Sequence, residues 1–294
     1  MKRLFKNKKI RYLLMVVILI VLVAGCTKIT DDKGVILEEK IIFLSTTFGE
    51  MMKNEGWFNG LLVWPVAFLI NYLTPLLGVG AAIVAVTVGV NVLTFGLTVQ
   101  STISSQKMQI VQPELTKIQE KYRDKKDQPS QMKMANEMNA LYAKHGIKPF
   151  GAILNLFIQI PIMIAMYQAV QRAEAVVHAK FMGVELVNSP AWGFKNQTYI
   201  LVIIFVLMIV TQFLSMKLPQ MLAKKRQEKI RKGRPDEKPP ANPQAAMTYG
   251  MLAMIGFLAV NWPTAMSLYW MITSIVNIAK TYFIQWRYID HEKV

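Results

Sequence analysis

The sequence predicts an all-α polytopic membrane protein with five transmembrane helices, a cytoplasmic helical hairpin and an outer amphipathic helix. Of its 294 residues, 53% are hydrophobic and 18% are charged, fewer charges than the roughly 25% of a soluble domain. The apolar residues gather in runs close to the ~20 residues that cross a bilayer as a helix. Lysine and arginine collect between these runs and give a net charge of +16.

The first 25 residues have the pattern of a signal peptide. Basic residues occupy positions 2–11, an apolar run covers 12–23, and Ala24 and Gly25 precede Cys26, the single cysteine. A basic segment, a short apolar run and small residues are typical of secretory signals. The string VAGC resembles a bacterial lipobox, so we expect residues 1–25 to be a lipoprotein signal peptide and Cys26 to carry lipid on the outer face. The alternative is an uncleaved anchor with an incidental cysteine.

The next two segments are expected on the outer side of the membrane. Residues 26–56 are mixed in charge and are predicted to be an extracellular N-terminal segment. Residues 57–77 are apolar, but they contain Pro65, Pro75 and several tryptophan and tyrosine residues. Such aromatic residues concentrate at membrane surfaces. We therefore expect 57–77 to be an amphipathic helix lying in the outer interface.

A core of five spans is predicted over residues 78–287. The expected spans are 78–99, 149–170, 198–216 and two short ones within 245–284, broken at Asn261, Trp262 and Pro263. Basic residues accumulate in 100–148 and in the loop 217–244, and the tail 288–294 is predicted to lie on the same side. Basic loops stay on the cytoplasmic side. This places Cys26 outside and the C-terminus inside, and the proline-rich end of 217–244 predicts a flexible linker.

The region 100–148 is predicted to form a helical hairpin. Apolar residues recur every three or four positions in 101–123 and again in 130–144, which is the period of an amphipathic helix. Pro113 either starts a new helical segment or kinks the first helix. Ser130 is expected to cap the second helix, and Gly146 to follow its end. Methionines on the apolar faces suit either adaptable contacts with partners or packing between the two helices.

Three strings resemble the YidC/Oxa1/Alb3 insertase family. They are QKMQIVQPELTKIQEKY, NLFIQIPIMIAMYQAV and AVNWPTAMSLYWMITSIVNIAKTYFI, and the resemblance extends over about 57–287. The lipobox is similar to that of the Gram-positive branch. The resemblance implies a membrane protein insertase and chaperone, which helps nascent membrane proteins insert, fold and assemble through a hydrophilic groove. It implies no catalytic activity and no cofactor, nucleotide or metal.

The resemblance also implies a location and partners. We expect a multi-pass protein of the bacterial plasma membrane, with a lipid anchor at its outer N-terminus and with nascent membrane proteins as clients. The Sec translocase and the ribosome are further candidate partners. The basic balance of the chain suits anionic lipid as well as RNA, and no specific nucleic-acid site is predicted.

Polar residues within the spans are the candidate lining of the groove, because polar groups in a membrane normally face the bundle interior. Those of the first span share one helical face, and Asn155 and Gln159 are four residues apart. Trp270 falls where the family has an aromatic residue that touches clients. The alternative role is hydrogen bonding that only holds the helices together. The predicted lining is Thr87, Asn91, Thr94, Thr98, Asn155, Gln159, Trp270, Thr273 and Asn277.

The chain departs from the family at the groove arginine. Aligned through LTVQSTISSQKMQ, the arginine position holds Asn91, and a family proline falls on Gly96. No lysine or arginine occurs between Gly78 and Gln106, and Lys280 lies near the end of its span, so no substitute charge is predicted. This absence favours, as an alternative, a specialised non-catalytic assembly or interaction paralogue. A small transporter fits less well, since we find neither a repeat nor a buried charge. An enzyme is disfavoured for want of a nucleophile–base pair.

Overall fold

The computed structural model describes residues 36–148, 151–231 and 243–290. The predicted signal peptide, Cys26 and residues 232–242 of the basic loop lie outside the described residues. The chain divides into two compact units, which are described separately. The first contains residues 1–89, 156–206 and 258–272, and the second contains residues 90–155, 207–257 and 273–294.

Helices account for most of the described structure. Three stretches are long and apolar enough to cross a membrane: Phe48–Leu77, Val79–Ile110 and Tyr199–Glu228, with a shorter apolar helix at Thr248–Asn261. The prediction of an all-α membrane protein is therefore confirmed at this level. The count of five spans and the interfacial position of 57–77 remain predictions.

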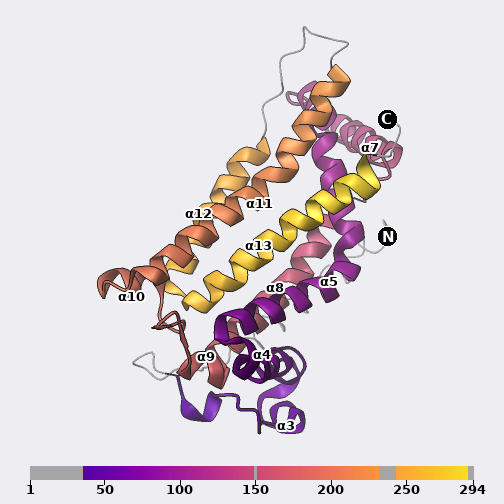
Figure 1. Ribbon diagram of the computed structural model, residues 1–294. Helices are drawn as coiled ribbons and strands as arrows, with labels where there is room; N and C mark the ends of the chain where they lie inside the picture. Colours follow the sequence, from indigo (N-terminus) through magenta and orange to yellow (C-terminus); the bar gives the residue numbers. More distant parts are fainter. Residues whose placement is uncertain (1–35, 149–150, 232–242, 291–294) are drawn as a thin grey trace. The chain divides into compact units, whose positions relative to one another are not determined.

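The first unit begins with a 3₁₀ turn at Glu38–Lys40, which two short helices follow (Figure 1). Helix α3 covers Phe48–Phe58, a π-helical turn covers Asn59–Val63, and α4 covers Trp64–Leu77. Thr47 and Glu50 form a reciprocal capping box that starts α3. Gly56 interrupts the helix with a φ of 84°, and Gly78 ends α4 with a φ of 81°. Only glycine adopts these values without strain. Helix α3 lies in the segment 26–56, for which no helix was predicted.

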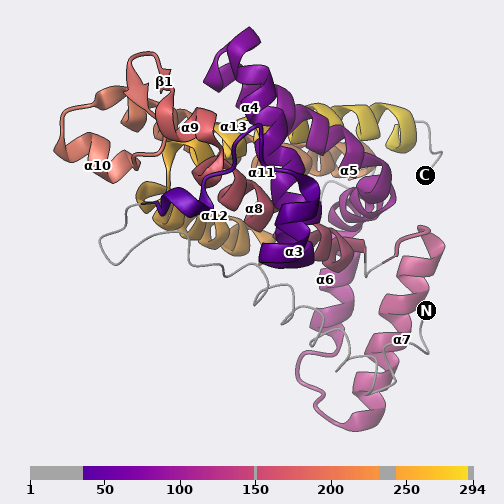
Figure 2. The same ribbon diagram turned by 90° about the horizontal axis from the view of Figure 1, so that it is seen from below.

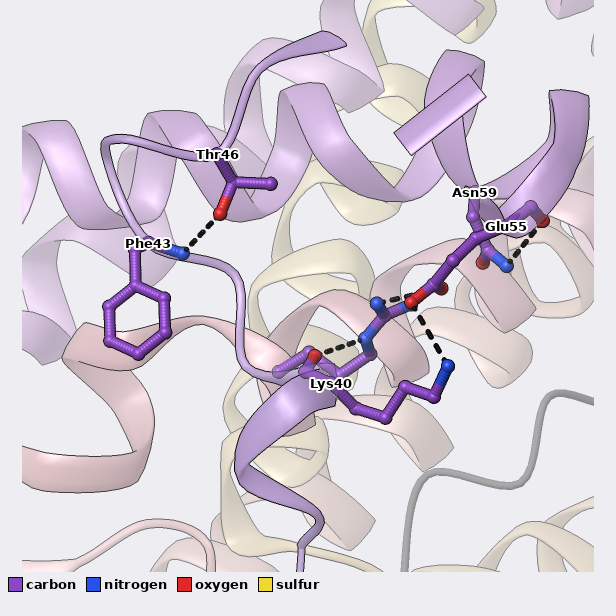
Figure 3. Close-up of polar contacts among 6 residues, drawn as sticks. Lys40, Phe43, Thr46, Glu55 and Asn59 are labelled. Atoms are coloured by element: carbon purple, nitrogen blue, oxygen red, sulfur yellow. Dashed lines mark hydrogen bonds and ion pairs between the residues drawn. The ribbon is translucent and has the colours of Figure 1, made fainter. Parts of the chain in front are cut away.

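Polar contacts hold the segment before α3 against the rest of this unit. The Asn71 side-chain amide donates to the Ile42 carbonyl at 2.6 Å and accepts from the Ala175 backbone N–H at 3.0 Å. The Lys40 ammonium lies 3.4 Å from the Glu55 carboxylate (Figure 3). Arg172 joins the same carboxylate at 2.8 Å. These contacts pin residues 40–42 beside α4 and the end of α8, which covers Gly151–Arg172.

A small folded loop completes the first unit (Figure 2). It contains α9 (Glu174–His178), the antiparallel strands β1 (Lys180–Phe181) and β2 (Val184–Glu185), and α10 (Pro190–Lys195). The loop is tied to the start of α13 (Thr264–Ile284). Thr264 donates to the Asn188 carbonyl through both its backbone N–H, at 3.0 Å, and its hydroxyl, at 2.8 Å.

Helix α5 begins in the first unit, continues into the second and leads directly toward the hairpin region. Helix α5 covers Val79–Ile110 and α6 covers Gln112–Lys121. The expected division near residue 100 is therefore absent, because no residue there stops a helix. The break comes at Val111, two residues before Pro113, which lacks a backbone donor and clashes with a preceding turn. Of the two predicted roles of Pro113, starting a new segment is the one observed.

Helices α6 and α7 (Gln128–Lys144) lie side by side (Figure 2). Asp127 caps α7 by accepting from the Ser130 N–H at 2.9 Å, so the prediction of Ser130 as the cap is wrong. The Asp127 carboxylate accepts from the backbone N–H of Ser130, one of the first-turn amides that have no acceptor within the helix. Gly146 follows the helix with a φ of 61°, as predicted. A shared core joins the helices, and Met108 and Met138 pack against it; its buried members are Val111, Leu115, Leu141 and Ile147.

Helix α11 corrects the prediction for the basic loop. It covers Tyr199–Arg231 and so continues through the first basic residues of 217–244, which were predicted to be a loop after a span ending at residue 216. Most of the proline-rich end, which was predicted to be a flexible linker, lies outside the described residues. Lysine, arginine, glutamine and alanine are good helix formers, and α11 carries them past Pro219. Helix α12 (Pro243–Asn261) runs beside α11 (Figure 1), and Gln220 donates to Thr248 at 2.7 Å. The predicted break at Asn261, Trp262 and Pro263 is confirmed, since α13 starts at Thr264.

Candidate functional site

A polar group in the second unit joins α5 to α13 at Asn91. The Asn91 side chain is 7% exposed, and its Nδ2 donates to the Thr273 hydroxyl at 3.3 Å. Its Oδ1 accepts from the Lys280 ammonium at 3.0 Å. Two of the predicted groove residues, Asn91 and Thr273, are therefore brought together.

Lys280 was not predicted as a site residue, but it contributes the charge of this polar group. Its side chain is half-buried, and its ammonium lies 5.6 Å from the centre of the Phe95 ring. Phe95 in turn meets Phe283 edge to face, with the ring centres 6.2 Å apart. Thr273, Asn277 and Lys280 share one face of α13 because they are four and three residues apart. This spacing could have identified Lys280 as a neighbour of the predicted groove residues. Its position near the end of the span instead suggested a lysine at the membrane surface.

The three threonines of α5 that were predicted to line the groove donate their hydroxyl hydrogens to carbonyls of the same helix. Thr87 donates to the Ile83 carbonyl at 2.7 Å, Thr94 to that of Val90 at 2.8 Å and Thr98 to that of Thr94 at 2.9 Å. Thr87 and Thr98 are buried, and Thr94 is half-buried. Such bonds satisfy the donors locally. Asn277 is exposed, and the Asn155 side chain lies outside the described residues.

Gln159 and Trp270, the last two predicted groove residues, lie in the first unit. Gln159 is exposed and donates to the Tyr269 hydroxyl at 3.2 Å. Trp270 is 8% exposed, and its ring stacks on Trp262 with centres 5.5 Å apart. Trp262 also meets Tyr167 at 4.6 Å. Trp270 therefore ends a row of aromatic rings and has little exposed surface.

Metal ligation is not indicated in the described part of the chain. No group of three or more His, Cys, Asp or Glu residues is placed there to hold a metal ion. The arrangement at Asn91 instead offers hydrogen bonding and one positive charge to a molecule that reaches it. Such a group suits binding and does not contain the elements of a catalytic centre.

The sequence of the chain is similar to that of one group of known proteins. The model of the 60Kd inner membrane protein family matches residues 70–291. The chain is 32% identical to the "Membrane protein insertase YidC 2" of Bacillus anthracis, over 95% of this chain and 94% of that protein. It is 32% identical to the "Membrane protein insertase MisCA" of Bacillus subtilis (strain 168), over 95% and 92%. A "Membrane protein insertase YidC" of Alkalihalophilus pseudofirmus is 28% identical, over 94% of each chain.

Proposed function

The chain belongs to the 60Kd inner membrane protein family, and we propose that it is a membrane protein insertase that helps nascent membrane proteins insert, fold and assemble. The relatives named insertases match nearly the whole chain, so the likeness covers the spans as well as the hairpin region. Its location as a multi-pass protein of the bacterial plasma membrane follows from the same relatives and from the apolar helices.

The observation that carries the mechanism is the polar group around Asn91. An amide, a hydroxyl and an ammonium meet between two mainly apolar helices. Moving a polar client segment across ~30 Å of hydrocarbon is costly, because its groups lose their water. Polar partners part of the way across lower that cost. In this proposal, Asn91, Thr273 and Lys280 contact the polar part of a client while its apolar part enters the lipid.

The remaining predicted residues have unequal support. Gln159 is exposed and has an amide to offer, which supports a client contact. Trp270 and Thr87 are buried, which supports a packing role instead. The hydrogen bonds of Thr94 and Thr98 within α5 support a packing role over a client contact. Each hydroxyl oxygen can still accept a hydrogen bond from a client.

The N-terminal lipid anchor and the orientation are part of the proposal. Cleavage before Cys26 and acylation of its sulfur hold the N-terminus on the outer leaflet, with five spans and a cytoplasmic C-terminus. The basic extension of α11 and the α6–α7 pair then face the cytoplasm. There the ribosome and the Sec translocase are candidate partners, and exposed lysines supply the charge that a ribosomal polyanion attracts.

Complementation tests the proposed function. The gene is expressed in cells depleted of their housekeeping insertase, and purified protein in liposomes is given a radiolabelled single-span client. Restored growth and protease-protected client are the expected results. Empty liposomes and the same client without its apolar segment are the controls. Failure in both assays would favour the assembly or interaction paralogue, which was suggested by the missing arginine. The charge of Lys280 at Asn91 now weakens that alternative.

A further inference from the structure

The loop 173–198, between α8 and α11, leaves three large apolar side chains exposed. Trp192 and Phe194, on α10, are 43% and 70% exposed, and Met182, between β1 and β2, is 71% exposed. Val176 and Leu186 of the same loop are fully buried, so the loop also contributes to the interior of the first unit. Large apolar groups that gather on the surface of a folded segment mark a site for a partner or a membrane.

A glycine contact fixes α10 at the point where α11 begins. The Thr198 N–H donates to the Gly193 carbonyl at 2.8 Å. A Cβ added at Gly193 would lie 2.9 Å from the Leu201 Cβ and 3.0 Å from the Thr198 carbonyl oxygen, which is too close for an ordinary contact. The backbone of α10 therefore packs directly on the first turn of α11. Trp192 and Phe194, on either side of this glycine, lie close to the level of that turn.

Helix α11 enters the membrane at its first turn. No charged residue occurs from Tyr199 to Met216, and basic residues begin at Lys217. At 1.5 Å per residue, this uncharged segment is about 27 Å long, close to the ~30 Å of hydrocarbon in a bilayer. Its two ends therefore lie near the two membrane surfaces. Tyr199 is exposed at one of these ends, a position that is typical of tyrosine.

A second glycine contact ties the strands of the loop to the first turn of α5. A Cβ added at Gly80 would overlap the Phe181 ring, so β1 lies directly against this turn. Helix α5 is also long and apolar enough to cross a membrane. Met182 and Gly183 have φ values of 51° and 85°, as in a two-residue hairpin turn. The loop therefore presents apolar groups beside the ends of two candidate spans.

Lipid is the occupant that this placement favours. Side chains held at the end of a span meet the interfacial layer of the bilayer, where amphipathic rings such as that of tryptophan concentrate. The loop has no net charge when histidine is neutral, since Lys180 and Lys195 balance Glu174 and Glu185. Its attraction to lipid therefore comes from apolar area and not from anionic headgroups.

We propose that the loop 173–198 inserts Met182, Trp192 and Phe194 into the interfacial layer of the leaflet that it faces. The contacts of Gly80 and Gly193 set the depth, because they hold these side chains where α5 and α11 enter the bilayer. In the proposed topology this is the outer leaflet. The inference goes beyond the proposed insertase function and does not depend on any client.

Depth-dependent quenching tests the insertion. In the full chain carrying Cys26→Ala, Phe194→Cys is labelled with the fluorophore NBD. The protein is reconstituted in phosphatidylcholine liposomes whose lipids carry a nitroxide at the headgroup, near the top of the acyl chain or near its end. We expect the nitroxide near the top of the chain to quench most strongly and iodide in the water to quench little. Met132→Cys is the matched control, because Met132 is 61% exposed on α7; there iodide should quench and the lipid nitroxides should not.

Glycine substitutions test what sets the depth. Gly193→Ala adds the Cβ that Leu201 and Thr198 exclude, so it should displace α10 and shift the quenching at position 194 toward the headgroup nitroxide and iodide. Gly250→Ala, in α12, is the matched control, because a Cβ there meets no atom within 4 Å; it should leave the profile unchanged. An unshifted profile in Gly193→Ala would show that this contact does not set the depth and would overturn that part of the inference.

Three outcomes at position 194 would overturn the insertion itself. Quenching by iodide alone would show that α10 stays in water. Protection from iodide and from every nitroxide would show that protein, such as a second copy of the chain, covers this face. Quenching by lipid only when phosphatidylglycerol is added would assign the contact to charge, whereas a neutral loop should give the same profile with and without it. Because the assay uses no client, none of these outcomes bears on the proposed function.

Discussion

The guanidinium of Arg172, at the end of α8, lies 2.8 Å from the Glu55 carboxylate in α3, and the two side chains are 1% and 9% exposed. The Arg172 Nε also donates to the Lys40 carbonyl at 2.7 Å. One buried cation thus joins the segment before α3, α3 itself and the end of a long apolar helix. This pairing makes the N-terminal part of the first unit depend on a residue far along the chain.

Arg172→Leu is expected to destabilise the protein by about 3–5 kcal/mol, because it leaves the buried Glu55 carboxylate without its closest cation. Thermal unfolding in detergent measures the change. Lys121→Gln breaks an ion pair whose side chains are 57% and 38% exposed and should have little effect, since exposed pairs contribute little. An Arg172→Leu protein as stable as the unmodified chain would show that the pair is dispensable.

The contact between α6 and α7 should weaken in acid. The Lys121 ammonium, at 2.7 Å, and the Tyr122 hydroxyl, at 2.8 Å, hold the pKa of Glu137 below its usual value of 4.5. A depressed folded-state pKa means that this stabilisation is complete above 4.5 and is lost as pH falls through the lower folded value. Protection of the backbone amides of residues 112–144 from hydrogen exchange, taken relative to the intrinsic exchange rate at each pH, should therefore fall in acid. Glu137→Gln should remove much of that pH dependence, and an unchanged profile in this variant would exclude Glu137 as its source.

Cys26→Ala should abolish acylation of the protein. The proposed lipobox provides no other sulfur, because Cys26 is the single cysteine of the chain. Cells grown with an alkyne fatty acid report incorporation on a gel, and precursor size reports signal cleavage. We expect no label and an unprocessed precursor. Normal processing with persistent label would show that Cys26 is not the modified residue.

Single-cysteine labelling in the Cys26→Ala background tests the orientation. Lys225→Cys, in the exposed extension of α11, should react with an impermeant maleimide only after the cells are opened. Asn196→Cys, in the exposed loop after α10, should react in intact protoplasts. The expectation follows from the concentration of basic residues on the cytoplasmic side. Reversed labelling would invert the proposed topology.

Local sequence determined the class of this protein and several of its boundaries. The apolar runs predicted a helical membrane protein because backbone groups in lipid must bond within the helix. The break before α13 followed from Pro263, and the end of α7 from Gly146, since these residues act on their own backbone. The same reasoning failed for the start of the basic loop, because charged residues alone do not end a helix such as α11.

Tertiary structure decided which polar groups meet. Asn91 and Lys280 are 189 positions apart, and nothing in their neighbouring residues specifies the pair. The sequence around Arg172 indicates only a basic residue at the end of a helix, and its pairing with Glu55 is seen only in the folded structure. A helix fixes which of its own residues share a face, but only the packing of one helix on another decides what that face contacts. A lysine near the end of a span can extend to the headgroups or turn inward, and here Asn91 on α5 supplies the acceptor that turns it inward.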